Sequence, residues 1–587
     1  MMAKRKADFK IILRIIPYFA GEKRLFLIGF ASMLFVSIAN ILDPLIIGHV
    51  IDKVIPDKDI SHLFLFAGLF VLVIVTAGIL TYIQTIVMSR LGVSIITRLK
   101  KDLYEHMLKL PISYFDKNPV GALMSRVESD SENVMQLFSS FSIIIIGNFI
   151  FFFAMVAVLM FKNPSVTLRI MIPIPILFTA ALLMINYLKK YFKRVRELNA
   201  EIIAVLTEYI QGISIVQLFN REMMAQNILD MKSKKKFIVE RNAAFIEYSF
   251  WSLYGFSIEI LFIVLVIILL APKVIAGIMT IGTLVIFLQY GRRIFEPLIQ
   301  ISENLNMIQR SLVSLTRIFS ILDIEDESVS FTDRKSPQFN HSIVFENVSF
   351  EYKKSEPVLN NINIEIKKNQ KIALVGASGS GKTTTVLLLC GFYHPTKGRI
   401  LIDGIDLKTM NIYEWRKKIG LVMQDIFMFP GNILENVRIY DDKIDEERVM
   451  SALKKVQIDE TVLRGDGIFR ELSERAQNIS TGERQLLSFA RAIVFSPELI
   501  VLDEATSSVD PRTERRIRDA MDDMLKDRTS LIVAHRLSTV LNADKIYLFQ
   551  DGEIISEGDH LRLMEKSPEY TKLVNLQFLS GKENEDR

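Results

Sequence analysis

A glycine-rich segment near residue 380 carries the residue types of a phosphate-binding loop. It reads Gly376-Ala-Ser-Gly-Ser-Gly-Lys-Thr383 and lies between the apolar run Ile372–Val375 and the helical pattern Thr384–Leu389. Glycines let backbone N–H groups surround phosphates at a helix N-terminus, where a lysine reaches the β and γ oxygens and a hydroxyl ligates Mg²⁺. The pattern therefore predicts an ATP site with Mg²⁺ on Thr383. The residues assigned to this loop are Gly376, Ser378, Gly379, Ser380, Gly381, Lys382, Thr383 and Thr384.

A second motif, Leu499-Ile-Val-Leu-Asp-Glu504, is an apolar strand pattern that ends in two acids. Ligands of parallel α/β sheets bind at the carboxyl ends of the strands, where these acids would lie. We expect Asp503 to hold Mg²⁺ directly or through water, and Glu504 to polarise the attacking water as general base. Without a phosphate loop upstream, an acid pair capping the helical stretch Pro511–Asp523 would be a plausible alternative.

Six apolar segments within about the first 300 residues are each long enough to cross a bilayer core of about 30 Å. They are Leu25–Ile47, Leu63–Met88, Phe138–Phe161, Thr167–Leu188, Phe250–Leu270 and Ile275–Leu298. The loops between them alternate between short and long, and the two long loops are residues 89–137 and 189–249. The first half is therefore predicted to be an all-α membrane domain of six helices.

Lysine and arginine residues set the orientation of these segments. Seven precede the first segment, and Arg90, Arg98, Lys100 and Lys101 follow the second. Because positive charge favours the cytoplasmic side, we expect the N-terminus, both long loops and the C-terminal half in the cytoplasm of a multi-pass cell-membrane protein. The basic, apolar stretch Met1–Arg24 is interpreted as an interfacial helix rather than a mitochondrial transit peptide.

Both long loops have helical periodicity and a breaker near the middle. The breakers, at Pro111–Pro119 and Gln211–Ser214, indicate either short transverse segments at the loop tips or ordinary turns.

Charged residues within or near the apolar segments are costly, at about 2.5–3.5 kcal/mol for a central position, unless they face protein or water. The residues concerned are Asp43, Arg169, Glu259, Arg292 and Arg293. We expect Asp43 and Glu259 to face a cavity or to bond between helices, and Arg292 and Arg293 to snorkel or to lie beyond the membrane.

The C-terminal half has soluble α/β patterning after a polar, acidic linker. Strand patterns at Lys371–Val375 and Leu499–Leu502 alternate with helical stretches, as a largely parallel sheet requires. The expected organisation is a membrane domain over 1–320, a linker over 321–341 and a phosphate-loop nucleotide-binding domain over 342–587. The formal net charge of +5 gives no case for a nucleic-acid partner. The single cysteine, Cys390, excludes an intramolecular disulfide framework and indicates a buried thiol.

Nearly the whole chain resembles a half-transporter of the ATP-binding-cassette exporter family. The resemblance implies that Tyr352 stacks on adenine and that Gln424 links Mg²⁺ and water to the membrane domain. It also implies that His535 is the switch histidine near the γ-phosphate, and that Asp510 communicates between two ATP sites. Taken singly, Tyr352 is equally a packing aromatic, Gln424 a surface amide and His535 a strand-end imidazole.

Three further segments match parts of the family that join the two domains. Glu474 resembles the exporter loop that contacts the membrane helices, and the tips Tyr114–Lys117 and Gly212–Val216 resemble the family's coupling helices.

The family's signature, usually Leu-Ser-Gly-Gly-Gln, reads Ile479-Ser-Thr-Gly-Glu483 in this chain. The resemblance implies that Ser480 and the Gly482 backbone close over the γ-phosphate of ATP held by the partner's loop. Thr481 adds a side chain and Glu483 adds negative charge near an anionic ligand, so both changes are expected to weaken the site completed for the partner. We therefore expect a heterodimer with a second half-transporter, with a homodimer as the alternative.

The sequence as a whole predicts ATP-driven export, by alternating access, of a hydrophobic or amphipathic substrate that is drug-like or lipid-like. A homodimeric lipid or drug flippase is one alternative, and a membrane channel or receptor gated by ATP is another. Six apolar spans argue against a soluble cassette ATPase acting on DNA or ribosomes, and an importer more often has its membrane domain on a separate chain.

Overall fold

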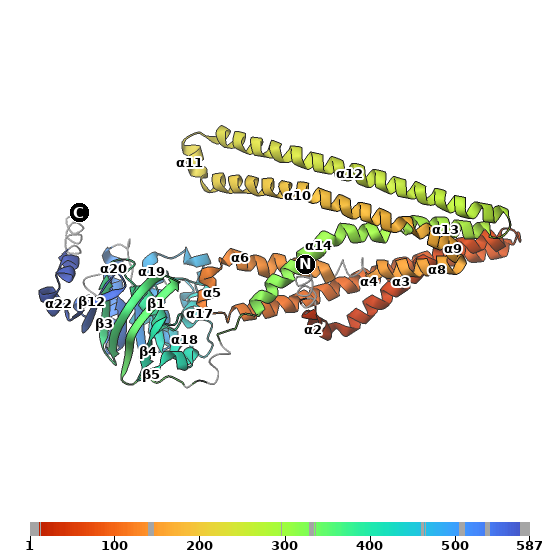
Figure 1. The fold of residues 1–587 in the computed structure, drawn as a ribbon. Coiled ribbons are helices and arrows are strands. Elements are labelled where there is room, and N and C mark those ends of the chain that lie inside the picture. The colour runs from red at the N-terminus through yellow and green to blue at the C-terminus, as the bar shows by residue number, and fades with distance from the viewer. Residues whose placement is uncertain are drawn as a thin grey trace. The chain divides into compact units, whose positions relative to one another are not determined.

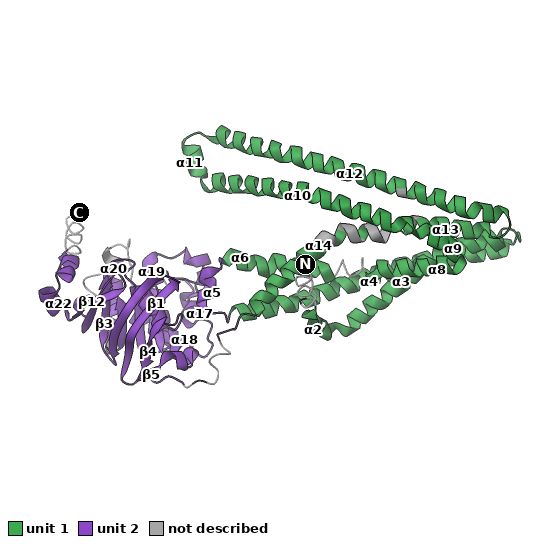
Figure 2. Ribbon diagram, in the orientation of Figure 1, with its two compact units in different colours: residues 1–108, 120–324 green, residues 109–119, 325–587 purple. Residues whose placement is uncertain are grey.

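The computed structural model describes residues 11–138, 146–294, 296–327, 334, 336–458, 463, 465–503, 511–534 and 540–575, except Ile12. Contacts divide the chain into two compact units. The first, the membrane unit, contains Met1–Leu108 and Val120–Ile324, and the second, the ATPase unit, contains Lys109–Pro119 and Glu325–Arg587 (Figure 2).

The membrane unit is built from helices. They are α2 (Ile16–Phe19), η1 (Ala20–Glu22), α3 (Lys23–His49), η2 (Val50–Val54), α4 (Ile60–Met107), α6 (Val120–Ser125), η3 (Arg126–Asp130), α7 (Ser131–Gln136), α8 (Asn148–Lys162), α9 (Pro164–Met171), α10 (Pro173–Gln211), α11 (Ile213–Leu218), α12 (Glu222–Ile275), α13 (Ile281–Arg293) and α14 (Glu296–Leu322). Within the described residues, four helical stretches are long and apolar enough to cross a membrane: Ile16–Val54, Ile60–Met107, Pro164–Gln211 and Glu222–Ile275. Two shorter apolar helices, Asn148–Lys162 and Ile281–Gly291, fit the predicted count of six, which stays a prediction.

The turn before α13 differs from the expected boundary. The sequence placed a loop at 271–274 and a new span from Ile275, but α12 continues to Ile275 and α13 begins at Ile281. Gly277 has φ +69°, a conformation that ends a helix easily only at glycine. The Thr280 hydroxyl then caps α13 by accepting from Thr283 N at 3.2 Å. Local capping chemistry, rather than hydropathy, sets this boundary.

The two long loops, 89–137 and 189–249, are largely helical, as their periodicity indicated. Helices α10 and α12 run side by side, with the short helix α11 at the turn between them (Figure 1). The other predicted tip is also a short helix, α5 (Ile112–Lys117), which belongs to the ATPase unit. Just before α5, Lys109 O accepts a hydrogen bond from Glu327 N at 2.9 Å.

Two of the charged residues in the apolar segments form an ion pair. Arg293 NH2 lies 2.7 Å from Asp43 Oδ2, and Arg293 NH1 also donates to Asn40 O at 3.3 Å. The expected interhelical bond of Asp43 is confirmed. The Arg293 side chain is 37% exposed while it pairs with this carboxylate, so its expected position, snorkelling or beyond the membrane, stays a prediction. The Arg292 side chain lies outside the described residues.

The ATPase unit contains two main sheets, and its elements follow α5 in chain order. They are β1 (Ser342–Lys353), β2 (Glu356–Lys367), β3 (Lys371–Gly376), α15 (Lys382–Leu389), β4 (Lys397–Ile402), β5 (Ile405–Asp406), η6 (Leu407–Thr409), α16 (Ile412–Arg416), β6 (Ile419–Val422), β7 (Gly431–Asn432), α17 (Ile433–Arg438), α18 (Glu446–Lys455), η7 (Gly467–Phe469), β8 (Glu471–Leu472), η8 (Glu474–Ala476), α19 (Thr481–Val494), β9 (Leu499–Asp503), α20 (Pro511–Leu525), β10 (Thr529–Val533), β11 (Lys545–Gln550), β12 (Glu553–Gly558) and α22 (His560–Lys566).

The larger sheet has the order β12-β11-β3-β10-β9-β6, in which only β12 pairs antiparallel, and the smaller antiparallel sheet has the order β2-β1-β4-β5. Side chains of β9 alternate between two buried clusters: Ile500 and Leu502 enter one, and Leu499 and Val501 the other. Because both faces of the sheet are covered, its central strands are uniformly apolar. The Cys390 thiol is buried as expected, and burial raises its pKa to about 12.

Candidate nucleotide site

The phosphate loop connects the end of β3 to the start of α15, as the sequence predicted. A Cβ on Gly376 would lie 2.2 Å from Phe549 O of the neighbouring strand, so the backbone passes too close for any side chain. Gly381, the N-cap of α15, has φ +102°, and a Cβ there would lie 2.4 Å from Leu359 Cδ2. Glycine is therefore required at both ends of the loop for it to turn directly onto the helix N-terminus.

Lys382 folds back over this loop. Its Nζ donates to Gly376 O at 2.9 Å and to Ala377 O at 2.7 Å, and it lies 3.3 Å from Ser380 Oγ. The side chain is buried, which lowers its pKa, and the Asp503 carboxylate acts in the opposite direction. The ammonium group is thus held inside the loop, where phosphates attract it.

Asp503 occupies the carboxyl end of β9 and is 5% exposed. Its Oδ1 is buried and has no hydrogen-bond partner among the described residues. A buried carboxylate oxygen without a donor is costly unless a cation binds it. The site therefore fits a magnesium ion, an oxygen-seeking cation.

Gln424 follows a strand adjacent to β9. Parallel β6 pairs Val422 with Leu502, so β6 and β9 end at the same edge of the sheet. Gln424 lies two residues beyond Val422 and is exposed. The topology thus brings Gln424, Asp503 and the phosphate loop to one edge of the parallel sheet.

Tyr352 lies beside the start of α15 and is 40% exposed. Its hydroxyl lies 3.2 Å from Thr384 Oγ1, and its ring packs edge-to-face against Phe350 and Tyr393 at centroid distances of 4.8 and 5.1 Å. The ring is held in position while part of it stays open, as stacking on a base requires. Sequence reasoning missed Tyr393, and the turn motif around it gives no signal for this contact.

Three predicted residues, Glu504, Asp510 and His535, lie outside the described residues. Glu474 is described and exposed, and it opens the short segment η8 (Glu474–Ala476), in which Arg475 has φ +55° and Ala476 φ +50°. Thr383 is also exposed, whereas Thr384 is buried.

The altered signature forms a capping box at the start of α19. Ser480 Oγ accepts from Glu483 N at 3.2 Å, and Glu483 Oε2 accepts from Ser480 N at 2.6 Å. Gly482 is buried, and the Thr481 hydroxyl accepts from Arg484 NH2 at 3.0 Å. The Ser-x-x-Glu pattern was readable from the sequence as a helix start, and its missed consequence is that the Glu483 carboxylate lies directly at the helix N-terminus.

Comparison with known proteins agrees with this architecture. The family description "ABC transporter transmembrane region" matches residues 26–298, and "ABC transporter" matches residues 359–507. An uncharacterised ABC transporter ATP-binding protein, YfiC of Bacillus subtilis, is 32% identical over 98% of this chain and 96% of its own length. An ATP-dependent lipid A-core flippase of Syntrophus aciditrophicus is 30% identical over 99% of this chain and 96% of its own length. A probable multidrug resistance ABC transporter ATP-binding/permease protein, YheH of Bacillus subtilis, is 32% identical over 82% of this chain and 72% of its own length.

A helical membrane unit joined to an α/β unit with a phosphate loop defines a membrane ATPase. The chain belongs to the ABC transporter family, as a half-transporter of the exporter type. It binds ATP, couples ATP hydrolysis to export, and spans the membrane several times with its ATPase domain in the cytoplasm.

Proposed function

We propose that this chain exports a hydrophobic or amphipathic molecule, drug-like or lipid-like, as one subunit of a heterodimer with two unequal ATP sites. Relatives named as a lipid A-core flippase and a multidrug resistance transporter support cargo of this kind. The heterodimer rests on one observation, the Glu483 carboxylate that accepts from the N–H of Ser480, the N-cap residue of α19.

In the proposed dimer, that carboxylate lies where the signature would meet the phosphate bound by the partner's loop. A helix N-terminus attracts anions through its free N–H groups, and in this chain Glu483 Oε2 already accepts from the Ser480 N–H. An incoming γ-phosphate meets a like charge and an N–H that already has an acceptor. Two copies of this chain would therefore form two weakened sites, whereas a relative with an intact signature would restore the site built on this chain's own phosphate loop.

In the proposed mechanism, binding of two ATP molecules closes the paired ATPase units and turns the membrane cavity outward. Lys382 and the loop N–H groups bind the phosphates, Tyr352 orients the base, and Glu504 takes the proton of the attacking water, with His535 near the γ-phosphate. Thr383, Gln424 and Asp503 would hold Mg²⁺, which when bound neutralises charge on the phosphates. Changing the population ratio of the outward-turned state to the other state from 1:99 to 99:1 needs about 5.5 kcal/mol of differential ATP binding. Phosphates bound at two sites can supply this free energy.

Glu483→Gln tests this proposal directly. Removing the charge while keeping an oxygen for the Ser480 N–H should lower the ATP concentration for half-maximal hydrolysis by the lone chain about tenfold, or about 1.4 kcal/mol. The ATPase rate of the lone chain and of the chain purified with a candidate partner half-transporter is measured in parallel. The pair should hydrolyse ATP well, and the lone wild-type chain poorly.

Glu446→Gln is the matched control, because it removes an exposed first-turn carboxylate from another helix of the same unit, α18. It should leave both preparations unchanged. A lone wild-type homodimer with full ATPase activity that does not respond to Glu483→Gln would show that the two sites are equal.

A further inference from the structure

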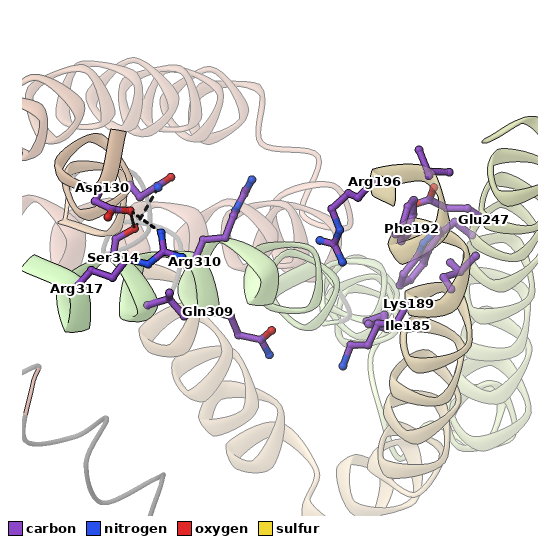
Figure 3. Close-up of a pocket in the computed structure, with 15 residues that line it drawn as sticks. Asp130, Ile185, Lys189, Phe192, Arg196, Glu247, Gln309, Arg310, Ser314 and Arg317 are labelled. Carbon is purple, nitrogen blue, oxygen red and sulfur yellow. Dashed lines mark hydrogen bonds and ion pairs between the residues drawn. The ribbon is translucent and has the colours of Figure 1, made fainter. Parts of the chain in front are cut away.

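The membrane unit has a partly open cavity of about 920 Å³ between α10, α12, α14 and the η3–α7 segment (Figure 3). Its apolar lining comes from Ile185, Leu188, Phe192, Val195, Trp251 and Val313. Sites for small molecules typically measure about 300–1,000 Å³, so this volume suits a headgroup with part of a hydrocarbon chain.

Charged side chains also line the cavity, and one group of them is already paired. Asp130 is 4% exposed; its Oδ1 accepts from Ser314 Oγ at 2.7 Å and lies 3.5 Å from Arg317 NH1 (Figure 3). Asn133 Nδ2 donates to the same Ser314 hydroxyl at 3.2 Å. This network fixes η3 and α7 against α14 and leaves Asp130 with no charge to offer a ligand.

The remaining charges are three cations, Lys189, Arg196 and Arg310, against one carboxylate, Glu247. Lys189 Nζ donates to Asn186 Oδ1 at 2.8 Å, which is a neutral partner. Arg196 and Arg310 have no ion-pair partner in the part of the chain that the structure describes, and all three cations are exposed. Within the described residues of this chain, the cavity lining therefore carries an excess of positive charge that no ion pair neutralises.

The position of these cations relative to the apolar surface is also informative. Lys189 directly follows the predicted span Thr167–Leu188, and Arg196 lies two helical turns further along α10. Ile185, Leu188 and Phe192 lie on the same stretch of α10 and line the same cavity. Lys189 and Arg196 therefore lie just beyond the end of the predicted apolar span, where we expect the cytoplasmic headgroups.

We propose that this cavity binds an anionic amphiphile, whose phosphate or carboxylate headgroup lies between Lys189, Arg196 and Arg310 and whose hydrocarbon chain lies against Phe192 and Trp251. Guanidinium groups pair with such oxyanions through two parallel hydrogen bonds, and the pairing strengthens away from bulk water. The inference rests on the proposed export function, because it names the substrate class. A neutral drug or a cationic amphiphile would leave these charges uncompensated.

The two tryptophans of the chain provide a direct binding assay. Trp251 lines the cavity, whereas Trp415 is fully buried in the ATPase unit, where its Nε1 donates to Leu389 O. A dodecyl phosphate brominated on its chain should quench Trp251 in the full-length protein without ATP. Dodecyltrimethylammonium brominated at the same carbon should bind at least tenfold more weakly, and inorganic phosphate should displace neither.

Charge substitutions test the three cations. Arg196→Gln and Arg310→Gln should each weaken quenching by dodecyl phosphate about tenfold, and Glu247→Gln should strengthen it severalfold. Lys190→Gln and Arg194→Gln are the matched controls, because both residues lie on α10 but do not line the cavity, and they should bind as wild type does. Gel filtration of every variant reports folding and assembly.

Equal quenching by the anionic and cationic amphiphiles would overturn the inference. Variants that lose the dimer but bind as wild type would overturn it too, because the cations would then pair with the partner subunit. The assay needs no ATP, so anion binding without ATP-dependent export would contradict only the export proposal. ATP-dependent export of another compound without anion binding would contradict only this inference.

Discussion

At the residue scale, the nucleotide site depends on two buried charges of opposite sign. The Lys382 ammonium is satisfied by carbonyl groups of its own loop, whereas Asp503 Oδ1 lacks a donor among the described residues. The loop is therefore stable before a nucleotide binds, and the carboxylate gains most from a cation. We therefore expect the loop around Lys382 to bind phosphate and Asp503 to bind the metal ion, and Glu504 follows Asp503 directly in the sequence.

Glu504→Gln should preserve ATP binding and reduce hydrolysis about 10²- to 10⁴-fold, because an amide cannot accept the proton of the attacking water. ATP binding and phosphate release are measured on the same preparation. Glu565→Gln, an exposed carboxylate on α22, serves as control. Undiminished hydrolysis by Glu504→Gln would remove this residue as the general base.

At the element scale, one carboxylate holds the start of strand β1, in the smaller sheet of the ATPase unit. Asp403, in the turn between β4 and β5, accepts from the backbone N–H groups of Asn340, His341 and Ser342 at 2.6, 2.9 and 2.9 Å. Burial alone would raise the pKa of Asp403, but the three donors outweigh it and the net pKa lies below the ordinary value of 3.8. The charged form thus stabilises the strand β1, so its contribution is present above pH 3.8 and is lost as pH falls through the lowered pKa.

Asp403→Asn should speed amide hydrogen exchange at the start of β1 about tenfold at pH 7, the equivalent of about 1.4 kcal/mol, by weakening these charge-assisted bonds. The difference from wild type should shrink at pH values below the lowered pKa, where the wild-type carboxyl is also neutral. Asp406→Asn is the control, because that carboxylate accepts a single nearby N–H, of Lys408. Equal protection of β1 in Asp403→Asn and wild type at pH 7 would refute this role.

At the scale of the whole molecule, the chain joins two units that differ in how they satisfy backbone hydrogen bonds and bury apolar surface. The membrane unit closes its backbone hydrogen bonds within helices, and the ATPase unit buries both faces of a parallel sheet. The short helix α5 belongs to the ATPase unit although the chain on both sides of it belongs to the membrane unit.

A pump and an ATP-gated channel differ in what hydrolysis does. In inverted vesicles, wild-type protein with its partner should accumulate a fluorescent amphiphile above its equilibrium level when ATP is added, and Glu504→Gln should abolish this accumulation. An ATP-gated channel would instead allow only flux down the concentration gradient, and the Glu504→Gln variant with bound ATP would keep the channel open. Such downhill flux through Glu504→Gln would contradict the pump mechanism.

Several features could be predicted because they depend on local sequence. Hydropathy located the apolar spans, and spacing located the phosphate loop, because both signals lie within about twenty consecutive residues. The capping box at Ser480 and Glu483 is equally local, and the structure adds to the predicted negative charge its position, at the N-terminus of α19.

The sequence by itself thus determined which segments are apolar, which glycine-rich loop joins a strand to a helix and which strand ends in Asp503, because each is a property of neighbouring residues. Only the tertiary structure decided that Arg293 pairs with Asp43 and that Tyr393 supports Tyr352. It also decided that Asp130 is paired, whereas Lys189, Arg196 and Arg310 form no ion pair within the described ranges. These partners are separated by up to about 250 residues along the chain. Charge balance between residues so far apart depends on how helices and strands pack, which no local pattern encodes.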